Sequence, residues 1–450
     1  MKDKNIGIKK KRRLRHVIIL SILLWPLPSQ AQDDVLTLEK AIQMALSRNE
    51  RAFQAGERVS AAEARVSKAR AYFLPTINAS GSYTRRPFES IRIIGGQQVI
   101  SQNYNALSGN VQLSLVLFDS RSIPALRQAS LDKNSEKNAA ADSKRKLAFE
   151  VSNAFLMTLS IDQVMEASKH RFNYAEQALE AAKARYAAGL VSANDVTRAE
   201  LEYATAEMGI TQVAGQVETT RLQLGYLLDD AESGRKSLQV PEFLLKAAED
   251  NPQAVEPLVV QAQGWRPDLI SLRWRARAQH ALILEPTLKW LPTLTFNGQY
   301  RYTNEPGLTG KNFNWNVGLT MNWPIFDGLI RNADYKERKS LAYMADLDVQ
   351  SAERKVEVDV RSAFIALNNA RASLKVATVA HNVALKNAAE TAELYRQGLS
   401  QALQVADANV RLFEAEVGLV QARDSLGIAY LNLDAALGLD PFGKESVIEY

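Results

Sequence analysis

An eleven-residue segment occurs twice in this chain of 450 residues, and the duplication constrains the fold more than any other feature. The first copy, FLPTINASGSY, runs from Phe73 to Tyr83, and the second, WLPTLTFNGQY, runs from Trp290 to Tyr300. Their Leu, Pro, Thr, Gly and Tyr stay in register at an offset of 217 residues. The chain is therefore expected to consist of two related halves.

Apolar and polar residues alternate after the proline of each copy, which predicts a strand with one apolar face. A second alternating segment follows in each half: GNVQLSLVLFD from Gly109 and NFNWNVGLTMNWPIFD from Asn312. The sequence thus predicts two strand hairpins. In the first, the apolar face of the second strand is expected to comprise Val111, Leu113, Leu115 and Leu117.

The opposite faces of these strands carry Asn, Thr, Ser, Gln and Arg, whereas a soluble sandwich would scatter Lys and Glu outward. Segments of about ten residues with one apolar face and aromatic ends are typical of transmembrane barrel strands. The aromatic residues expected to face the membrane are Tyr83, Tyr300, Tyr302, Trp315 and Trp323. Ordinary soluble hairpins on a helical body are the alternative.

Four strands cannot close a barrel, because a sheet in a bilayer has no free edges and known barrels begin at about eight strands. Further copies of the chain must therefore complete it. Two copies give about eight strands, with an interior filled by side chains, and three give about twelve, with an open lumen. The residues leave both options open.

Two stretches without Gly or Pro, from Ala125 to Ala188 and from Arg331 to Gln397, predict very long helices. At 1.5 Å per residue, each reaches on the order of 100 Å. The apolar stripe is narrow, as at Val360, Phe364 and Leu367. Long helices with narrow stripes pack side by side as coiled-coil-like sheets or tubes.

Matched turns end both long helices, ARYAAGLVSANDV from Ala184 and ELYRQGLSQALQV from Glu393. Gly189 and Gly398 supply the left-handed residue that ends a helix. Ser192 followed by Asp195 predicts the N-cap of the next helix in the first half. We expect a first repeat over 32–230, a linker over 231–264 that forms an equatorial region, a second repeat over 265–440 and a tail over 441–450.

The first 31 residues predict a cleaved secretory signal peptide. A start with eight Lys and Arg against one Asp precedes an apolar run from Val17 to Leu27 and small residues at Ser29 and Ala31. An uncleaved anchor is the alternative, but a spanning helix needs about twenty apolar residues. Cleavage removes a net +7, so the charge changes from +5 to −2 and nucleic acid is not an expected partner.

Enzyme signatures are missing from the sequence. Of its four His, His170, His280 and His381 have no metal-type neighbour at i+3 or i+4, and no HExxH, P-loop or GxGxxG motif occurs. We therefore expect no catalytic residue, no cofactor and no metal site. The chain contains no Cys, which fits an exported protein without disulfides and excludes a lipid anchor on an N-terminal Cys.

The motifs LFDS and IFDG after the second strands, RPDL at Arg266, and RY..GL and LY..GL at the helical turns occur in duplicated order. With them the chain resembles the TolC-like outer membrane factors from about Leu36 to Leu439. The resemblance implies an α+β membrane protein, a homotrimer with a transmembrane β-barrel of four strands per chain, a long α-helical barrel and a periplasmic girdle.

The resemblance also implies a function and a location. The trimer would be a channel in the outer membrane of a Gram-negative bacterium, in contact with outer-membrane lipid and with a large periplasmic portion. It would form the exit duct of a tripartite efflux or type I secretion system. An inner-membrane pump or ABC exporter would deliver substrates to this passive conduit through a periplasmic adaptor protein. The cargo is not implied.

Site residues follow from the same resemblance. Gly189, Leu190, Gly398 and Leu399 would be the tips that contact the adaptor, and Asp195, Tyr395, Gln404 and Asp407 would form the periplasmic gate. Gln404 replaces one of two expected carboxylates, and Ser400 stands where an Arg would pair with Asp195. A salt-bridge lock is therefore in doubt.

A three-fold axis would by itself turn Asp407 into a ring of three carboxylates, which attracts cations. Alternatively, Asp195 and Asp407 only complement helix dipoles. For the whole protein, the competing hypothesis is a periplasmic coiled-coil adaptor or a surface interaction protein without a pore. An adaptor would carry one hairpin between small β domains, and an adhesin would carry heptads without the duplication.

Overall fold

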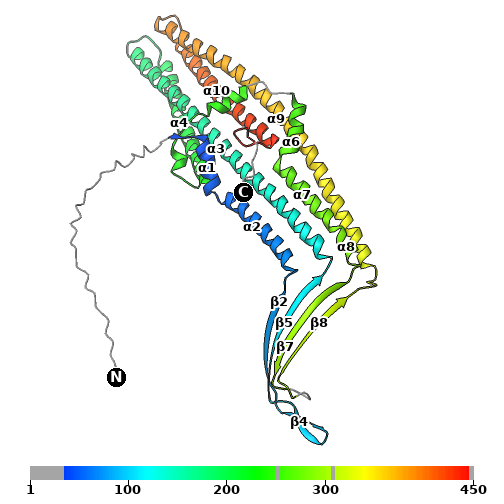
Figure 1. Cartoon of the computed structure of the whole chain (residues 1–450). Coiled ribbons are helices and arrows are strands. Elements are labelled where there is room, and N and C mark those ends of the chain that lie inside the picture. Colours follow the sequence, from blue (N-terminus) through cyan, green and yellow to red (C-terminus); the bar gives the residue numbers. More distant parts are fainter. Residues whose placement is uncertain (1–34, 250–253, 306–309, 445–450) are drawn as a thin grey trace, which may run out of the picture.

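The computed structural model describes residues 35–249, 254–305 and 310–444. The predicted signal peptide, residues 1–31, and residues 445–450 of the predicted tail lie outside this part of the chain. The protein is a long rod in which a four-stranded sheet forms one end and two helical hairpins form the other (Figure 1).

Two helices extend through most of the helical part, α3 (Ser122–Ala187) and α9 (Ile330–Arg396), which confirms the prediction from the missing Gly and Pro. Helices α2 (Glu50–Ala71) and α4 (Ala193–Leu228) both pack along α3. In the second half, α7 (Pro267–Leu282) and α10 (Ala402–Leu437) pack along α9 in the same way. Because α3 also contacts α7 and α10, the two halves form one layer of helices.

Smaller elements surround the middle of this layer (Figure 1). Strand β1 (Val35–Leu36) pairs in parallel with β6 (Ser237–Leu238), and α1 (Leu38–Arg48) packs on α3. The remaining elements of this region are η1 (Ser233–Arg235), α5 (Glu242–Glu249) and α6 (Val255–Trp265). Helix α8 (Leu284–Leu288) follows α7 and packs on α9 near the sheet.

The two largest apolar clusters lie at this level, where these smaller elements cover the long helices. One cluster joins α1, α3 and α4 through Leu147, Phe155 and Leu224. A second joins α6, α7, α9 and α10 and includes Val360 and Leu426. Among the described helices, none is long and apolar enough to cross a membrane.

The sheet consists of β2 (Thr76–Arg85), β5 (Asn105–Phe118), β7 (Thr293–Thr303) and β8 (Phe313–Asn322), antiparallel and in the order β2-β5-β7-β8. The two predicted hairpins are thus joined through β5 and β7. The register aligns Ile77 with Leu113, Leu113 with Gly298 and Gly298 with Val317. Since cross-strand partners share a face, the apolar residues of all four strands lie on one side.

Two details of the sheet differ from the prediction. The register of β5 against β7 shifts between Val116 and Phe118, so Phe118 and not Leu117 pairs with Leu294 at the end of the apolar row. Such a bulge interrupts strict alternation. In addition, residues between β2 and β5 form a separate hairpin of β3 (Ser90–Ile94) and β4 (Gln97–Gln102), which the sequence did not predict.

Candidate functional site

The two helical hairpins end in turns of the same geometry. Gly189 and Gly398 have φ angles of 71° and 80°, the left-handed region that favours glycine. The next amides, of Leu190 and Leu399, donate to carbonyls five residues earlier at 2.9 and 2.8 Å and so satisfy the ends of α3 and α9. Both leucine side chains are then left in solvent, 74% and 73% exposed.

Ser192 is the N-cap of α4, as the sequence predicted, and Asp195 lies in the first turn of the helix and completes a capping box. Its Oδ2 accepts hydrogen bonds from the backbone N of Ser192 at 3.0 Å and from the Ser192 hydroxyl at 2.8 Å. The bond from the Ser192 hydroxyl, and to a smaller extent the bond from its backbone N, lowers the pKa of the Asp195 carboxyl. A carboxylate in this capping-box position also complements the helix dipole.

Gln404 has the same role in the second half, six residues after Gly398 as Asp195 is six after Gly189. Its Oε1 accepts from the backbone N of Gln401 at 3.1 Å and from the Ser400 hydroxyl at 2.6 Å. An amide oxygen therefore caps α10 where a carboxylate caps α4. The duplication explains why both predicted gate positions make bonds inside their own hairpin.

The other two predicted gate residues lie in different surroundings. Tyr395 and Asp195 line one groove between the hairpins, so the structure brings these two together. Asp407 lies one turn before Arg411, whose Nε is 3.7 Å from its Oδ1. Both side chains of this pair are largely exposed.

Sequence reasoning missed the arginines of α3 near the tip. The guanidinium of Arg185 lies over the ring of Tyr395, 4.0 Å from its centroid, and Arg171 lies over Phe413 at 5.0 Å. Arg171 also forms an ion pair of 2.8 Å with Glu202 on α4. The available signal was the spacing, because residues 14 apart lie on the same face of a coiled-coil helix.

The predicted aromatic residues lie on the apolar side of the sheet. Tyr300 pairs across the strands with Trp315, and Tyr302 pairs with Phe313. The Phe313 ring lies 5.9 Å from that of Tyr300 and 5.0 Å from that of Tyr302. Tyr83 is exposed on the same face of β2, as the register of β2 with β5 requires.

Trp323 lies just beyond β8, at the end of the sheet that meets the helices. Its Nε1 donates to the carbonyl of Trp290 at 3.0 Å, and its ring remains exposed. An indole with a satisfied N–H and an exposed ring suits the boundary between apolar and polar surroundings.

Polar side chains form cross-strand hydrogen bonds on the other side of the sheet. Gln299 donates from Nε2 to Oδ1 of Asn110 at 2.8 Å, and Asn297 donates from Nδ2 to the hydroxyl of Thr320 at 3.3 Å. The polar face that the sequence indicates is therefore a continuous surface across three strands.

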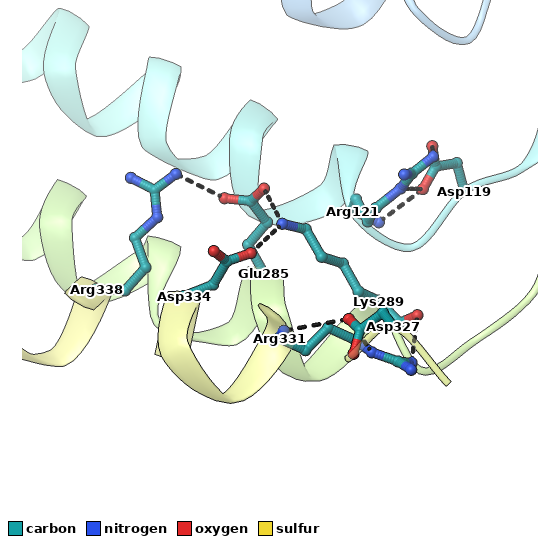
Figure 2. A network of polar contacts seen from close by, with 8 residues as sticks. All are labelled: Asp119, Arg121, Glu285, Lys289, Asp327, Arg331, Asp334 and Arg338. Atoms are coloured by element: carbon teal, nitrogen blue, oxygen red, sulfur yellow. Dashed lines mark hydrogen bonds and ion pairs between the residues drawn. The ribbon is translucent and has the colours of Figure 1, made fainter. Parts of the chain in front are cut away.

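The LFDS and IFDG motifs hold the junctions between strands and helices (Figure 2). Asp119 accepts from Arg121 Nε and Nη2 at 2.8 and 2.7 Å, and from the Tyr72 hydroxyl at 2.6 Å. Burial raises the pKa of the Asp119 carboxyl, but these donors outweigh it and lower the pKa to about 2. The carboxylate thus fixes the turn from β5 into α3.

Asp327 performs the corresponding task between β8 and α9. Its Oδ2 accepts from Arg331 Nε at 2.7 Å, and the Arg331 guanidinium lies over the Trp290 ring at 3.7 Å from the centroid. Lys289 adds ion pairs of 3.6 Å to Glu285 and 2.8 Å to Asp334 (Figure 2). The pair between Lys289 and Asp334 joins the end of α8 to α9 beside the sheet.

Comparison with known proteins extends this description. The family described as outer membrane efflux protein matches residues 41–230 and 258–439. The outer membrane protein TolC of Escherichia coli (strain K12) is 24% identical over 95% of this chain and 86% of that protein. The outer membrane protein OprJ of Pseudomonas aeruginosa is 26% identical over 89% of this chain and 84% of that protein.

Solved structures of similar fold cover nearly the whole chain. A membrane protein from Pseudomonas aeruginosa superposes with a TM-score of 0.76 at 21% identity, covering 92% of both chains. The outer membrane protein VceC of Vibrio cholerae has a TM-score of 0.73 at 16% identity, covering 90% of this chain and 96% of that one. With its duplicated hairpins, its four-stranded sheet and a family match over both halves, the chain belongs to the outer membrane efflux protein family.

Proposed function

We propose that three copies of this chain assemble into a continuous duct through which substrates leave the cell envelope. The duct lies in the outer membrane of a Gram-negative bacterium and extends far into the periplasm. The observation that carries the proposal is the sheet β2-β5-β7-β8, which exposes an apolar face and offers two edge strands for further pairing.

Those edges are β2 and β8. In the sheet of the described residues, β2 has β5 as its neighbour and β8 has β7, so each has one edge without a partner strand. A bilayer tolerates a sheet only when every backbone group is paired. Pairing β8 of one copy with β2 of the next satisfies both edges, and three copies give about twelve strands around an aqueous lumen. The Asn, Gln and Thr side then lines the lumen.

The helices support the same assembly. Their contacts place α4 and α9 at opposite edges of the layer toward the tips, with α3 and α10 between them. Each edge helix exposes apolar residues at heptad spacing. They are Leu201, Met208 and Leu222 on α4, and Val358, Ile365 and Val379 on α9. Such stripes are the seams of coiled coils, and we propose that α9 of one copy covers α4 of the next.

The tips and the gate take the roles expected from the family. Leu190 and Leu399 are exposed at the ends of the hairpins, where a periplasmic adaptor can bury them. Asp407 contributes one carboxylate per copy to the narrow periplasmic end of the duct, and the positive charge of Arg411 partly offsets it. Transport through the duct is passive because the sequence carries no nucleotide-binding motif. An inner-membrane pump or ABC exporter supplies the energy and completes a tripartite efflux or type I secretion system.

The first test is the mass of the mature protein extracted from the outer membrane in mild detergent, corrected for bound detergent. Three chains per particle and a stable conductance in planar bilayers are expected. A monomer in the soluble periplasm would refute the duct and favour an interaction protein.

Adjacent residues of β8 offer a matched pair of variants. Val317 lies on the apolar face and Asn316 on the polar face. Val317→Arg is expected to destabilise the membrane-inserted protein by roughly 2–4 kcal/mol if the position lies near the bilayer midplane. Asn316→Arg is expected to preserve assembly and to alter ion selectivity. Equal loss of trimer in both variants would contradict the proposed orientation of the sheet.

A further inference from the structure

The basic residues at the two ends of the four-stranded sheet have different surroundings. At the end that meets the helices, Arg121 pairs with Asp119 at 2.7 Å, and the corresponding arginine after β8 also pairs with a carboxylate at 2.7 Å. The far end, comprising residues 84–104 and 301–312, contains five basic residues and two acidic ones. The far end therefore carries an excess of positive charge that its own carboxylates cannot neutralise.

Two adjacent arginines at the far end differ in their partners. Arg86 forms an ion pair with Glu305 of the second connection. Arg85 follows Tyr83 by two residues in β2 and is aligned with Asn105, so it continues the apolar row of the sheet. Its side chain is exposed, and no carboxylate of the described residues lies within ion-pair distance of it. Arg85 therefore presents a free charge on the face that the proposed duct turns toward lipid.

Tyr104 fixes the orientation of the Arg85 guanidinium. Nη2 of Arg85 donates to the Tyr104 hydroxyl at 3.2 Å, and the guanidinium carbon lies 4.9 Å from the centroid of the Tyr104 ring. The remaining N–H donors of Arg85 have no acceptor among the described residues. A guanidinium whose orientation is already fixed loses less freedom when it binds, and its parallel N–H groups match the oxygens of a phosphate.

The position of Arg85 along β2 corresponds to the depth of lipid headgroups. The strand has 10 residues from Thr76 to Arg85, and nine steps of about 3.4 Å give roughly 31 Å along the strand. Strands of membrane barrels tilt by about 40°, so the height is about 24 Å. The apolar band of such barrels is about 25 Å tall and is flanked by aromatic residues, as Arg85 is by Tyr83. Arg85 therefore lies just outside the hydrocarbon, in the leaflet away from the periplasmic helices.

We propose that Arg85 and Lys311 bind the phosphate groups of lipids in the outer leaflet of the membrane. This inference rests on the proposed duct and adds a lipid site to it. Lys311 is exposed just before β8, and it has no ion pair with the described residues. Because β8 of one copy pairs with β2 of the next in the duct, Lys311 of one copy and Arg85 of its neighbour lie at the outer end of one seam. Phosphate is the matching ligand because it is anionic, offers several acceptor oxygens and occurs at this depth of a bilayer.

The test is the affinity of the purified full-length trimer in mild detergent for diphosphorylated lipid A, for dephosphorylated lipid A and for inorganic phosphate, measured by native mass spectrometry. Arg85→Gln is expected to weaken binding of diphosphorylated lipid A about tenfold, the effect of losing one charge-assisted hydrogen bond. Arg85→Lys keeps the charge without the planar fork and is expected to weaken it less. Arg301→Gln is the matched control. Arg301 is aligned with Asn110 and Asn314 on the polar face, so its loss removes the same charge and is expected to leave lipid binding unchanged.

Three results would overturn the lipid site. They are parental affinity in Arg85→Gln, an equal loss in Arg301→Gln, and equal affinity of the parent for lipid A with and without its phosphates. Inorganic phosphate that binds as tightly as diphosphorylated lipid A would assign the site to free phosphate and would also overturn it. Lys311→Gln, expected to weaken binding roughly fivefold, keeps the proposal testable should Arg85→Gln not assemble. A parent protein extracted as a monomer would instead refute the proposed function, since binding is measured on trimers.

Discussion

Replacing Asp434 by Asn is expected to stabilise the protein strongly at pH 8 and far less at pH 4.5. The Asp434 side chain lies near the end of α10 and the residue is only 4% exposed. Its Oδ2 is buried without a hydrogen-bond partner. Burial, together with the charge of Asp440, raises the pKa of this carboxyl to about 7. The negative end of the helix dipole acts in the same direction.

The direction and the size of the expected change in stability follow from the difference between the pKa of Asp434 in the folded protein and in the unfolded chain. The folded protein keeps a proton on Asp434 that the unfolded chain releases near its usual pKa of 3.8. Stability therefore falls as pH rises between about 4 and 7, and the full penalty remains above pH 7. The difference between 3.8 and about 7 is about 3 pKa units, which at 1.36 kcal/mol each gives on the order of 4 kcal/mol. Asn cannot ionise and removes this penalty.

The assay is the apparent midpoint of thermal unfolding of the detergent-solubilised protein, at one scan rate for all samples because such unfolding is often irreversible. Asp268→Asn is a control of opposite sign. Burial raises the pKa of Asp268, but hydrogen bonds and charge from Arg266 outweigh it and lower the pKa. Losing that carboxylate is expected to destabilise the protein at pH 8. Destabilisation by Asp434→Asn at pH 8, or an equal shift at both pH values, would refute the reasoning.

Four further substitutions test the tips, the core and the gate. In Gly398→Val the new side chain meets open space, but φ +80° strains the backbone by roughly 1–2 kcal/mol. We therefore expect this variant to assemble in the outer membrane and to cross-link less to the adaptor. Failure of the variant to reach the outer membrane would contradict this expectation. Gly438→Ala places a Cβ 2.9 Å from the backbone of Arg266, so it is expected to lower the unfolding midpoint more than Gly398→Ala does. Asp407→Asn is expected to lower cation selectivity and Arg411→Gln to raise it, as measured by reversal potentials in a salt gradient; unchanged selectivity would remove Asp407 from the gate.

Much of the fold could be predicted because it follows from local patterns. The absence of Gly and Pro predicts α3 and α9 almost to their ends, and Gly189 and Gly398 mark both turns. Alternation in Ile77–Tyr83 and its copy predicts the apolar face of the sheet, since the period of side chains along a strand is two. The N-cap at Ser192 was equally visible. Each of these signals needs only neighbours along the chain.

Less of the candidate site could be predicted. The four gate positions came from resemblance, and the sequence did not indicate that Gln404 caps α10 or that Arg185 covers Tyr395. The bulge at Leu117 breaks the alternation that predicted its face. Such features depend on which distant segments meet. The spacing of Arg171 and Arg185 indicates a shared face of α3, but it does not indicate which rings of the second half that face meets.

The sequence by itself thus determined the repeat, the helices and the two faces of the strands, because backbone propensity and side-chain period act over a few residues. Tertiary structure decided the strand order β2-β5-β7-β8, the hairpin β3–β4, the burial of Asp434 and the pairing of arginines with aromatic rings across the two halves. Their physical reason is packing between segments far apart in the chain, which sets burial, local dielectric and contact geometry only once the two halves lie side by side.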